Sequence, residues 1–491
     1  MLKHISLAFF FTFIGKILAF FRVQQLAIHY GQDYWLDAFF IVFSFTSFFD
    51  TVLISGAIAT TFIPIYLKQK ATSVYKAEKL YTNIFSVMFS FFAIVSIFLW
   101  FFSYEISLLL VKGTNTKLIM AVDYLMKYFS LFPLLSLLFQ LPTIYNQANR
   151  KFQLSTLNPI LLNGTQLFLI FIVSIYGVLA ERDVLFFLIA YMLAMLFCFV
   201  LQVYFYRLAQ PRQLFSFEFK KLKFFSIAIF PFIIFISIEE LNLLVDQYFA
   251  TSLNEGSVSN LLYASRLIKI FGAVFVASIV TVFYPKISVL LAKGKFKNVR
   301  YVSCLIIELL IVFTLPIVFV FYYFSINIAN LLYGQGVGGE VSEVLSYYSF
   351  LVFTSSIYMI QIRLVYSIGI NKSVLVFCVI ISALNFILNT IFIKLLGLSG
   401  LALSTVLVSA IQVVLFDFYL RSKGMILFSA KMLLRILLYI TYLLGLISVI
   451  VKFLPVLVNE LWLVGVILIM FVYFVTSMLL NKKLYIRLIN L

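Results

Sequence analysis

Long apolar runs follow one another along almost the whole chain, and short polar segments separate them. A transmembrane helix needs about 20 mostly apolar residues to cross a hydrocarbon core of about 30 Å. The pattern predicts an all-α polytopic membrane protein. Windows of this length predict fourteen helices, at 4–28, 36–62, 81–111, 121–146, 155–178, 184–207, 223–250, 257–284, 300–332, 342–369, 373–394, 398–420, 432–451 and 458–480.

The composition agrees with this interpretation. Of the 491 residues, 64% are hydrophobic and 11% are charged, which excludes a soluble fold. Cys198, Cys304 and Cys378 stand singly in apolar runs, so we interpret them as core residues and not as disulfides or metal ligands. Lys16 interrupts the first apolar run, which favours a helix over a cleaved signal peptide.

The charges are unevenly distributed between the loops. The formal net charge is +18, and with the N-terminus in the cytoplasm most Lys and Arg residues fall on inner loops. Inner loops of membrane proteins are rich in Lys and Arg. We therefore predict that both termini are cytoplasmic and that the basic excess requires no nucleic-acid partner. The outer loops hold only Lys112, Lys117, Arg182, Lys394 and Lys452.

The chain also contains a faint internal repeat. Pro64 matches Pro285, and Tyr145 matches Tyr366, at the same offset of 221 residues. Chance matching in an apolar sequence is the alternative. An equal offset in two separated blocks favours two six-helix lobes around a central cavity, and an even number of helices makes the repeats parallel. We predict an N-lobe over 1–210, a C-lobe over 211–425, and two additional helices with a short cytoplasmic tail over 426–491.

Several permanent charges lie inside the predicted spans. Lys16 and Arg22 belong to the first helix, and Arg266 and Lys269 lie three residues apart on the eighth. An unpaired charge at the bilayer centre costs at least about 3 kcal/mol, so these groups pair or line a wet cavity. Buried ion pairs, such as Glu239 with Arg266, are one interpretation. A cationic cavity for a phosphate or pyrophosphate head group is the other, with cations from each lobe.

The two cations of the first helix point in different directions. Six residues separate Lys16 from Arg22, which is about 9 Å along a helix and about 120° around it. They are not expected to hold one phosphate together in a straight helix. For both cations to act on one head group, the helix must break at Gly15 or the head group must pass from one cation to the other in two steps.

Polar residues on two other helices suggest a cation site. Asn385 and Asn389 are four residues apart on the eleventh helix, and such a pair commonly forms contacts between helices. Together with Asp246 of the seventh helix, their oxygens also suit a small hard cation such as Na⁺.

The sequence lacks motifs that would indicate catalysis. It has only His4 and His29, no GxxxxGK[ST] phosphate loop and no HExxH metal motif, and the outer loops are short. We therefore expect a transporter and not an enzyme, with no cofactor, driven by Na⁺ or by the membrane potential. A polytopic glycosyltransferase or polymerase is the alternative from another class.

Five blocks of the sequence resemble the MurJ (MviN) lipid II flippase family of the multidrug/oligosaccharidyl-lipid/polysaccharide exporter superfamily. The resemblance implies two lobes around a cationic cavity and a lipid-facing groove formed by the last two helices. It implies a monomer in the bacterial cytoplasmic membrane that moves an undecaprenyl-pyrophosphate-linked saccharide, lipid II, to the outer leaflet by alternating access. A flippase for O-antigen, capsule or exopolysaccharide precursors is the alternative. The blocks are 15–43, 55–68, 145–163, 245–273 and 331–337.

The resemblance also assigns residues. It implies that Lys16, Arg22, Arg266 and the acidic Asp37 contact the substrate, to which the spacing adds Lys269. A sodium site known in one branch of the family falls on Asp246, Asn385 and Asn389. Two positions depart from the family pattern, because Asp50 stands where the family often has a third arginine and Ser55 where it usually has an acid.

Overall fold

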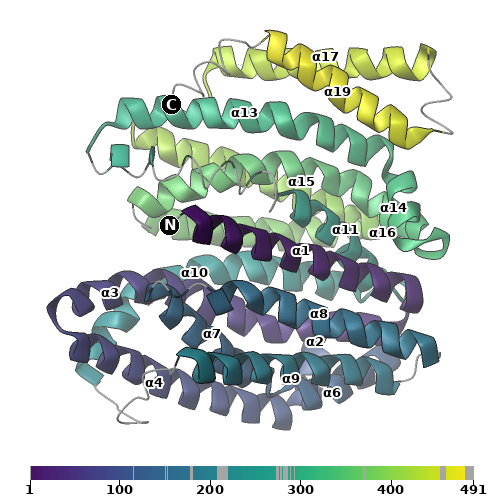
Figure 1. Cartoon of the computed structure of the whole chain (residues 1–491). Coiled ribbons are helices and arrows are strands. Elements are labelled where there is room, and N and C mark those ends of the chain that lie inside the picture. Colours follow the sequence, from purple (N-terminus) through teal and green to yellow (C-terminus); the bar gives the residue numbers. More distant parts are fainter. Residues whose placement is uncertain are drawn as a thin grey trace. The chain divides into compact units, whose positions relative to one another are not determined.

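The structure is a computed structural model of the whole chain. It describes residues 2–113, 115–149, 151, 153–176, 181–206, 219–272, 276, 279, 283, 286–287, 289–291, 293–368, 372–453 and 461–480. Within these residues the regular elements are all helices, as Figure 1 shows.

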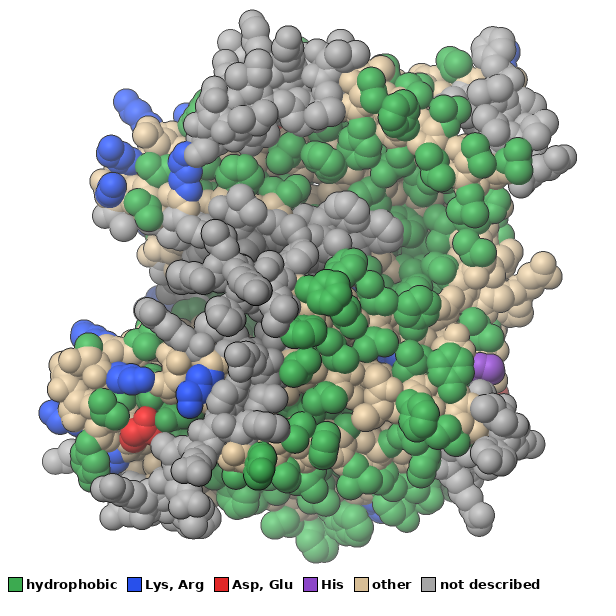
Figure 2. Space-filling model, viewed as in Figure 1, with side chains coloured by type: hydrophobic (Ala, Val, Ile, Leu, Met, Phe, Trp, Pro, Cys, Tyr) green, Lys and Arg blue, Asp and Glu red, His purple; other side chains and the backbone are tan. Residues whose placement is uncertain are grey.

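The helices confirm the predicted class of an all-α polytopic membrane protein. Seven described helices are long and apolar enough to cross a membrane, and an eighth candidate is the bent pair Thr116–Phe129 and Phe132–Ala148. The total of fourteen spans stays a prediction. On the face seen in Figure 2, hydrophobic side chains cover much of the surface, as expected for contact with lipid.

The chain divides into two compact units, Met1–Tyr263 and Ala264–Leu491. The lobe boundaries at 210 and 425 stay a prediction. The second unit contains α13 (Phe296–Tyr323), α14 (Ser325–Tyr333), α15 (Gln335–Ile368), α16 (Lys372–Ser422), α17 (Ala430–Phe453) and α19 (Trp462–Leu480). The first contains α1 (Leu2–Tyr30), α2 (Tyr34–Phe49), η1 (Asp50–Ile58), α3 (Ala59–Thr72), α4 (Val74–Phe101), α5 (Ser103–Leu110), α6 (Thr116–Phe129), α7 (Phe132–Ala148), α8 (Gln153–Tyr176), α9 (Glu181–Tyr206) and α10 (Phe219–Ala250), and α11 (Ser257–Phe271) begins in it.

The second predicted span is longer than expected. Helices α2, η1 and α3 run on as one helix of 39 residues, Tyr34–Thr72. Its middle, η1, is a π-helix, in which the Ser55 hydroxyl donates to the Asp50 carbonyl at 3.3 Å. Gly56 permits the close approach of α10, because a Cβ there would lie 2.7 Å from Ile236 Cδ1. A π-helix of nine residues is rare in proteins, and the π-helical segments that do occur are often found at functional sites.

Polar contacts fix the end of this helix to its neighbours in the first unit. The Tyr66 and Tyr145 hydroxyls both donate to Glu78 Oε1 at 2.8 Å, which joins α3, α4 and α7. Lys70 donates to Asn149 Oδ1. Exposed lysines, Lys68 and Lys76 among them, surround this end of the unit.

Helix α1 packs closely on α8. A Cβ at Gly15 would lie 2.6 Å from Pro159 Cβ, so the two backbones meet at this glycine. Asn163 Nδ2 donates to the Gly15 carbonyl at 3.3 Å. These contacts support the part of α1 that carries the two cations.

In the second unit, α16 is a helical hairpin. It spans 51 residues, with non-helical angles at Gly397 (φ 58°, ψ −131°). Ser404 Oγ donates to Asn389 Oδ1 across 15 residues, a separation of about 22 Å in a straight helix. The two halves therefore fold back on each other and correspond to the predicted spans 373–394 and 398–420.

The C-terminal helices pack on α13, and Figure 1 shows α17 and α19 along it. Phe313 of α13 packs on Phe474 of α19, with ring centroids 5.0 Å apart. Arg435 of α17 donates to both carboxylate oxygens of Glu308 of α13, at 2.8 and 3.0 Å.

Candidate functional site

The two cations of α1 have different surroundings. Lys16 is exposed, whereas Arg22 is buried with 8% of its surface exposed. Arg22 Nη1 donates to Gln166 Oε1 of α8, and the guanidinium lies 5.9 Å from the centroid of the Phe43 ring of α2. Gln166 Nε2 in turn donates to the Phe187 carbonyl of α9 at 3.4 Å. Arg22 thus contacts α8 and α2, and α9 holds its partner Gln166, whereas Lys16 is exposed, in agreement with the predicted difference in direction.

Asp37 caps the start of α11. Its Oδ2 accepts from Gly256 N at 2.8 Å, and its Oδ1 accepts from Ser259 N at 2.8 Å and from Ser259 Oγ at 2.5 Å. The first N–H groups of a helix lack partners within the helix, and a carboxylate also interacts favourably with the positive end of the dipole. Gly256 has φ 84°, and a Cβ there would overlap Gln32. Contact of Asp37 with substrate stays a prediction.

Asp50 and Ser55, the two positions that depart from the family pattern, do not contact each other through both side chains. Asp50 Oδ1 accepts from Ser136 Oγ of α7 at 2.6 Å. Ser55 is exposed, and its hydroxyl contacts the Asp50 backbone and not the carboxylate. The acid that replaces a cation is therefore stabilised by a neutral donor of α7.

Arg266 and Lys269 share one face of α11. Arg266 is half-buried and Lys269 is exposed. Both belong to the second unit, and Lys16 and Arg22 belong to the first, so the cavity between lobes stays a prediction. The side chain of Glu239, the alternative partner of Arg266, lies outside the described residues.

The candidate sodium ligands are all buried. Asp246 is 3% exposed, and Asn385 and Asn389 are fully buried. Asn389 Nδ2 donates to Asn385 Oδ1 at 3.4 Å, and Ser404 donates to Asn389 Oδ1. Asn389 therefore makes a contact between helices, which is the common role of such a pair. Asp246 lies in the other unit, and the joint cation site stays a prediction.

Sequence reasoning missed several polar residues that hold the candidate site. Gln166 and Ser136 are 2% and 0% exposed, and each contacts a predicted or departing site residue. A polar side chain in an apolar run was their only signal. Within the described chain, no group of three or more His, Cys, Asp and Glu residues could hold a metal ion.

A chain of long apolar helices with a buried arginine, Arg22, on its first helix has the general features of a membrane transporter. A multidrug transporter of the exporter superfamily named above, in its inward-facing conformation, has the same fold, with a TM-score of 0.67, 13% identity, and coverage of 83% of this chain and 94% of that one. The model of the lipid II flippase MurJ family matches residues 26–473, and the chain belongs to this family. The predicted family is confirmed.

Individual relatives agree. The probable lipid II flippase MurJ of Buchnera aphidicola subsp. Baizongia pistaciae (strain Bp) is 23% identical over 457 residues, 87% of each chain. The lipid II flippase MurJ of Thermosipho africanus (strain TCF52B) is 28% identical over 171 residues, 34% of this chain and 35% of the relative. A solved lipid II flippase MurJ in an inward closed conformation has a TM-score of 0.82 and 25% identity, over 98% of this chain and 100% of that one. The chain is a multi-pass transporter of the bacterial inner membrane.

Proposed function

We propose that this chain moves lipid II, the lipid-linked precursor of peptidoglycan, from the inner to the outer leaflet. The observation that carries the proposal is the family match over residues 26–473. The likeness to a solved flippase over 98% of the chain supports it. The alternatives, a flippase for other glycans or a glycosyltransferase, are not favoured by the relatives described above.

The carrier is of the undecaprenyl-pyrophosphate type. Arg22 supports this part of the proposal, because a guanidinium offers several donors to phosphate oxygens and keeps its charge in an apolar site. Lys16 adds an exposed point charge on the same helix. The residues that bind the substrate are Lys16, Arg22, Asp37, Arg266 and Lys269. The protein acts as a monomer and binds no nucleic acid.

Both termini lie in the cytoplasm, and transport proceeds by alternating access. The excess of Lys and Arg on alternate loops supports this topology. Na⁺ or the membrane potential supplies the energy, since one charge that crosses 100 mV is worth about 2.3 kcal/mol. Asp246, Asn385 and Asn389 are the candidate Na⁺ ligands.

Complementation tests the function. We expect the gene to restore growth when the native lipid II flippase of a bacterial host is depleted. Lys16→Ala, Arg22→Ala and Arg266→Ala should each abolish rescue while the protein still inserts, as membrane fractions would show. Loss of rescue together with restoration of a missing surface polysaccharide would instead establish the alternative substrate. Full rescue by all three variants would contradict the cationic site.

A further inference from the structure

Arg435 is an arginine of α17 with an acidic partner on another helix. Its Nη1 donates to both oxygens of Glu308, at 2.8 and 3.0 Å, and Tyr439 OH donates to Glu308 Oε1 at 3.4 Å. Glu308 is 6% exposed, whereas 52% of the Arg435 side chain is exposed. One nitrogen of the guanidinium is therefore fixed to α13, and the rest of the group is directed to the surface.

The remaining donors of Arg435 are available. In the described part of the chain, Nε and Nη2 make no hydrogen bond, and Glu308 contacts Nη1 alone. A guanidinium has five N–H donors in a planar fork that matches phosphate oxygens. A half-exposed arginine that is fixed through one nitrogen, with no bond from the other two within the described chain, is thus arranged to bind an anion from outside the protein.

The helix surface beside Arg435 is apolar. Leu434 and Leu438 of α17 lie within about 100° of it around the helix and are 60% and 58% exposed. Arg435 is five residues after the start of α17, which places it about 8 Å along the helix. With the topology proposed above, this is the inner end of α17, close to the phosphates of the inner leaflet. A lipid would place its phosphate at Arg435 and its chains on Leu434 and Leu438.

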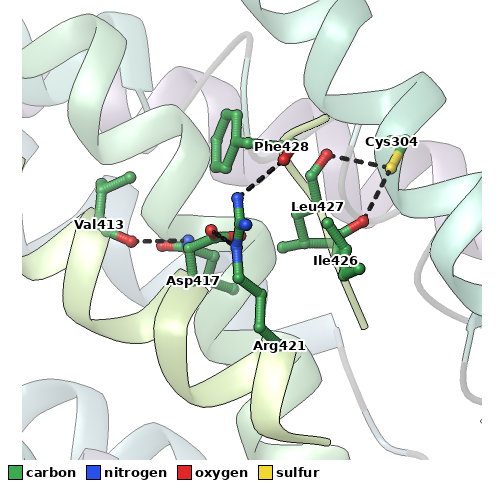
Figure 3. Close-up of polar contacts among 8 residues, drawn as sticks. Cys304, Val413, Asp417, Arg421, Ile426, Leu427 and Phe428 are labelled. Atoms are coloured by element: carbon green, nitrogen blue, oxygen red, sulfur yellow. Dashed lines mark hydrogen bonds and ion pairs between the residues drawn. The ribbon is translucent and has the colours of Figure 1, made fainter. Parts of the chain in front are cut away.

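Arg421 of α16 offers a comparison within the same unit. Its Nε donates to Asp417 Oδ2 at 2.5 Å, and its Nη2 donates to the Phe428 carbonyl at 2.8 Å, as Figure 3 shows. Its side chain is 44% exposed, close to the value for Arg435. The two arginines thus have similar exposure and one acidic partner each, but Arg421 uses two of its three nitrogens within the protein and Arg435 uses one.

We propose that Arg435 binds the phosphate of a membrane lipid in the inner leaflet, and that Glu308 and Tyr439 are positioning residues for it. The proposal rests on the topology under the proposed function, because that topology puts the start of α17 at the inner face. The ligand chemistry is a phosphate monoester, diester or pyrophosphate with an apolar chain. The substrate and a phospholipid both carry such a group.

Native mass spectrometry of the purified full-length protein tests the site. Undecaprenyl pyrophosphate and phosphatidylglycerol are titrated separately, and bound lipid is counted for the wild type, Arg435→Gln and Arg421→Gln. We expect Arg435→Gln to weaken binding of at least one lipid about tenfold or more, as for loss of a hydrogen bond to a charged group. Arg421→Gln should bind both lipids within about threefold of the wild type.

The double variant Glu308→Gln/Arg435→Gln separates lipid binding from folding, because it leaves no buried carboxylate without a partner. It should unfold at a temperature close to that of the wild type and still bind lipid weakly. If Arg435→Gln loses binding of undecaprenyl pyrophosphate alone, the site belongs to the substrate. If it loses binding of phosphatidylglycerol, the site belongs to a phospholipid. Unchanged binding in Arg435→Gln, or an equal loss in Arg421→Gln, overturns the proposal. Because the assay measures binding and not transport, failure of the proposed function would leave this result intact.

Discussion

At the scale of single residues, the buried cation of α1 depends on a neutral partner. Gln166 uses both ends of its amide, one for Arg22 and one for the Phe187 carbonyl. Gln166 is a neutral acceptor, so its contact fixes the guanidinium without cancelling its charge.

Changes at Gln166 should therefore separate folding from transport. Gln166→Leu leaves a buried donor of Arg22 without its acceptor, and we expect the free energy of unfolding to fall by about 1–3 kcal/mol. Gln166→Glu keeps the acceptor but neutralises Arg22, so the protein should fold while lipid II transport falls. Denaturant titration and a flipping assay in proteoliposomes measure the two effects.

Gln25→Leu is the control, because Gln25 contacts the exposed His29 at 3.0 Å on the same helix. It should leave stability and transport near the wild-type values. Wild-type transport by Gln166→Glu would show that the charge of Arg22 is not used.

The cap at Asp37 gives a second prediction at this scale. Asp37→Ala removes the acceptor of three hydrogen bonds at the start of α11, and loss of a cap costs about 0.5–2 kcal/mol. We expect faster hydrogen exchange at the Ser259 amide and reduced transport, since α11 carries Arg266. Asp33→Ala is a matched control, because Asp33 caps α2 through Trp35 N at 2.7 Å. Equal transport by the two variants would contradict a special role for the α11 cap.

At the scale of elements, the turn in α16 depends on one glycine. Gly397 has φ 58° and ψ −131°, a conformation that side chains with a Cβ rarely adopt. We expect Gly397→Ala to lower the free energy of unfolding by about 1–3 kcal/mol.

Gly445→Ala is its control, because no atom lies within 4 Å of a Cβ at Gly445 in the α17 helix. This variant should be neutral or slightly more stable, because alanine favours helix. Thermal unfolding of both purified variants compares them. Equal midpoints would show that the turn tolerates a side chain.

The spans could be predicted from sequence because their signal is local. Apolar length alone located α13, α15 and α17, and the turn at Gly397 lies between two predicted spans. The π-helix at Asp50–Ile58 could not be predicted, since its side-chain contacts come from Ser136 and Ile236, far away in sequence.

The candidate site was only partly predictable for the same reason. A charge in an apolar run located Arg22 and the family pattern located Asp37, but their partners Gln166 and Ser259 required the fold. Asp37 was predicted as a substrate contact from the family pattern. The fold shows that Asp37 also caps α11. This contact depends on the loop before α11 and leaves no periodic pattern in the sequence.

At the scale of the whole molecule, the proposed topology makes a direct prediction. In a variant without Cys198, Cys304 and Cys378, single cysteines are placed at Ala71 and Gln335, exposed positions at the ends of two spanning helices. In intact cells, a membrane-impermeant maleimide should label Gln335→Cys and not Ala71→Cys. Opened membranes should allow labelling of both. Labelling of Ala71→Cys in intact cells would reverse the proposed orientation.

The helix Tyr34–Thr72 is too long for the membrane that it crosses. Its 39 residues extend about 58 Å, nearly twice the hydrocarbon thickness of about 30 Å. With the proposed topology, the end that carries Lys68 and Lys70 stands in the cytoplasm. The helix then acts as a lever: a tilt of about 10° about its midpoint, near the π-helix, would displace each end by about 5 Å. A cytoplasmic protein that bound this end would therefore be displaced by a small movement at the centre of the bilayer, or would restrict that movement.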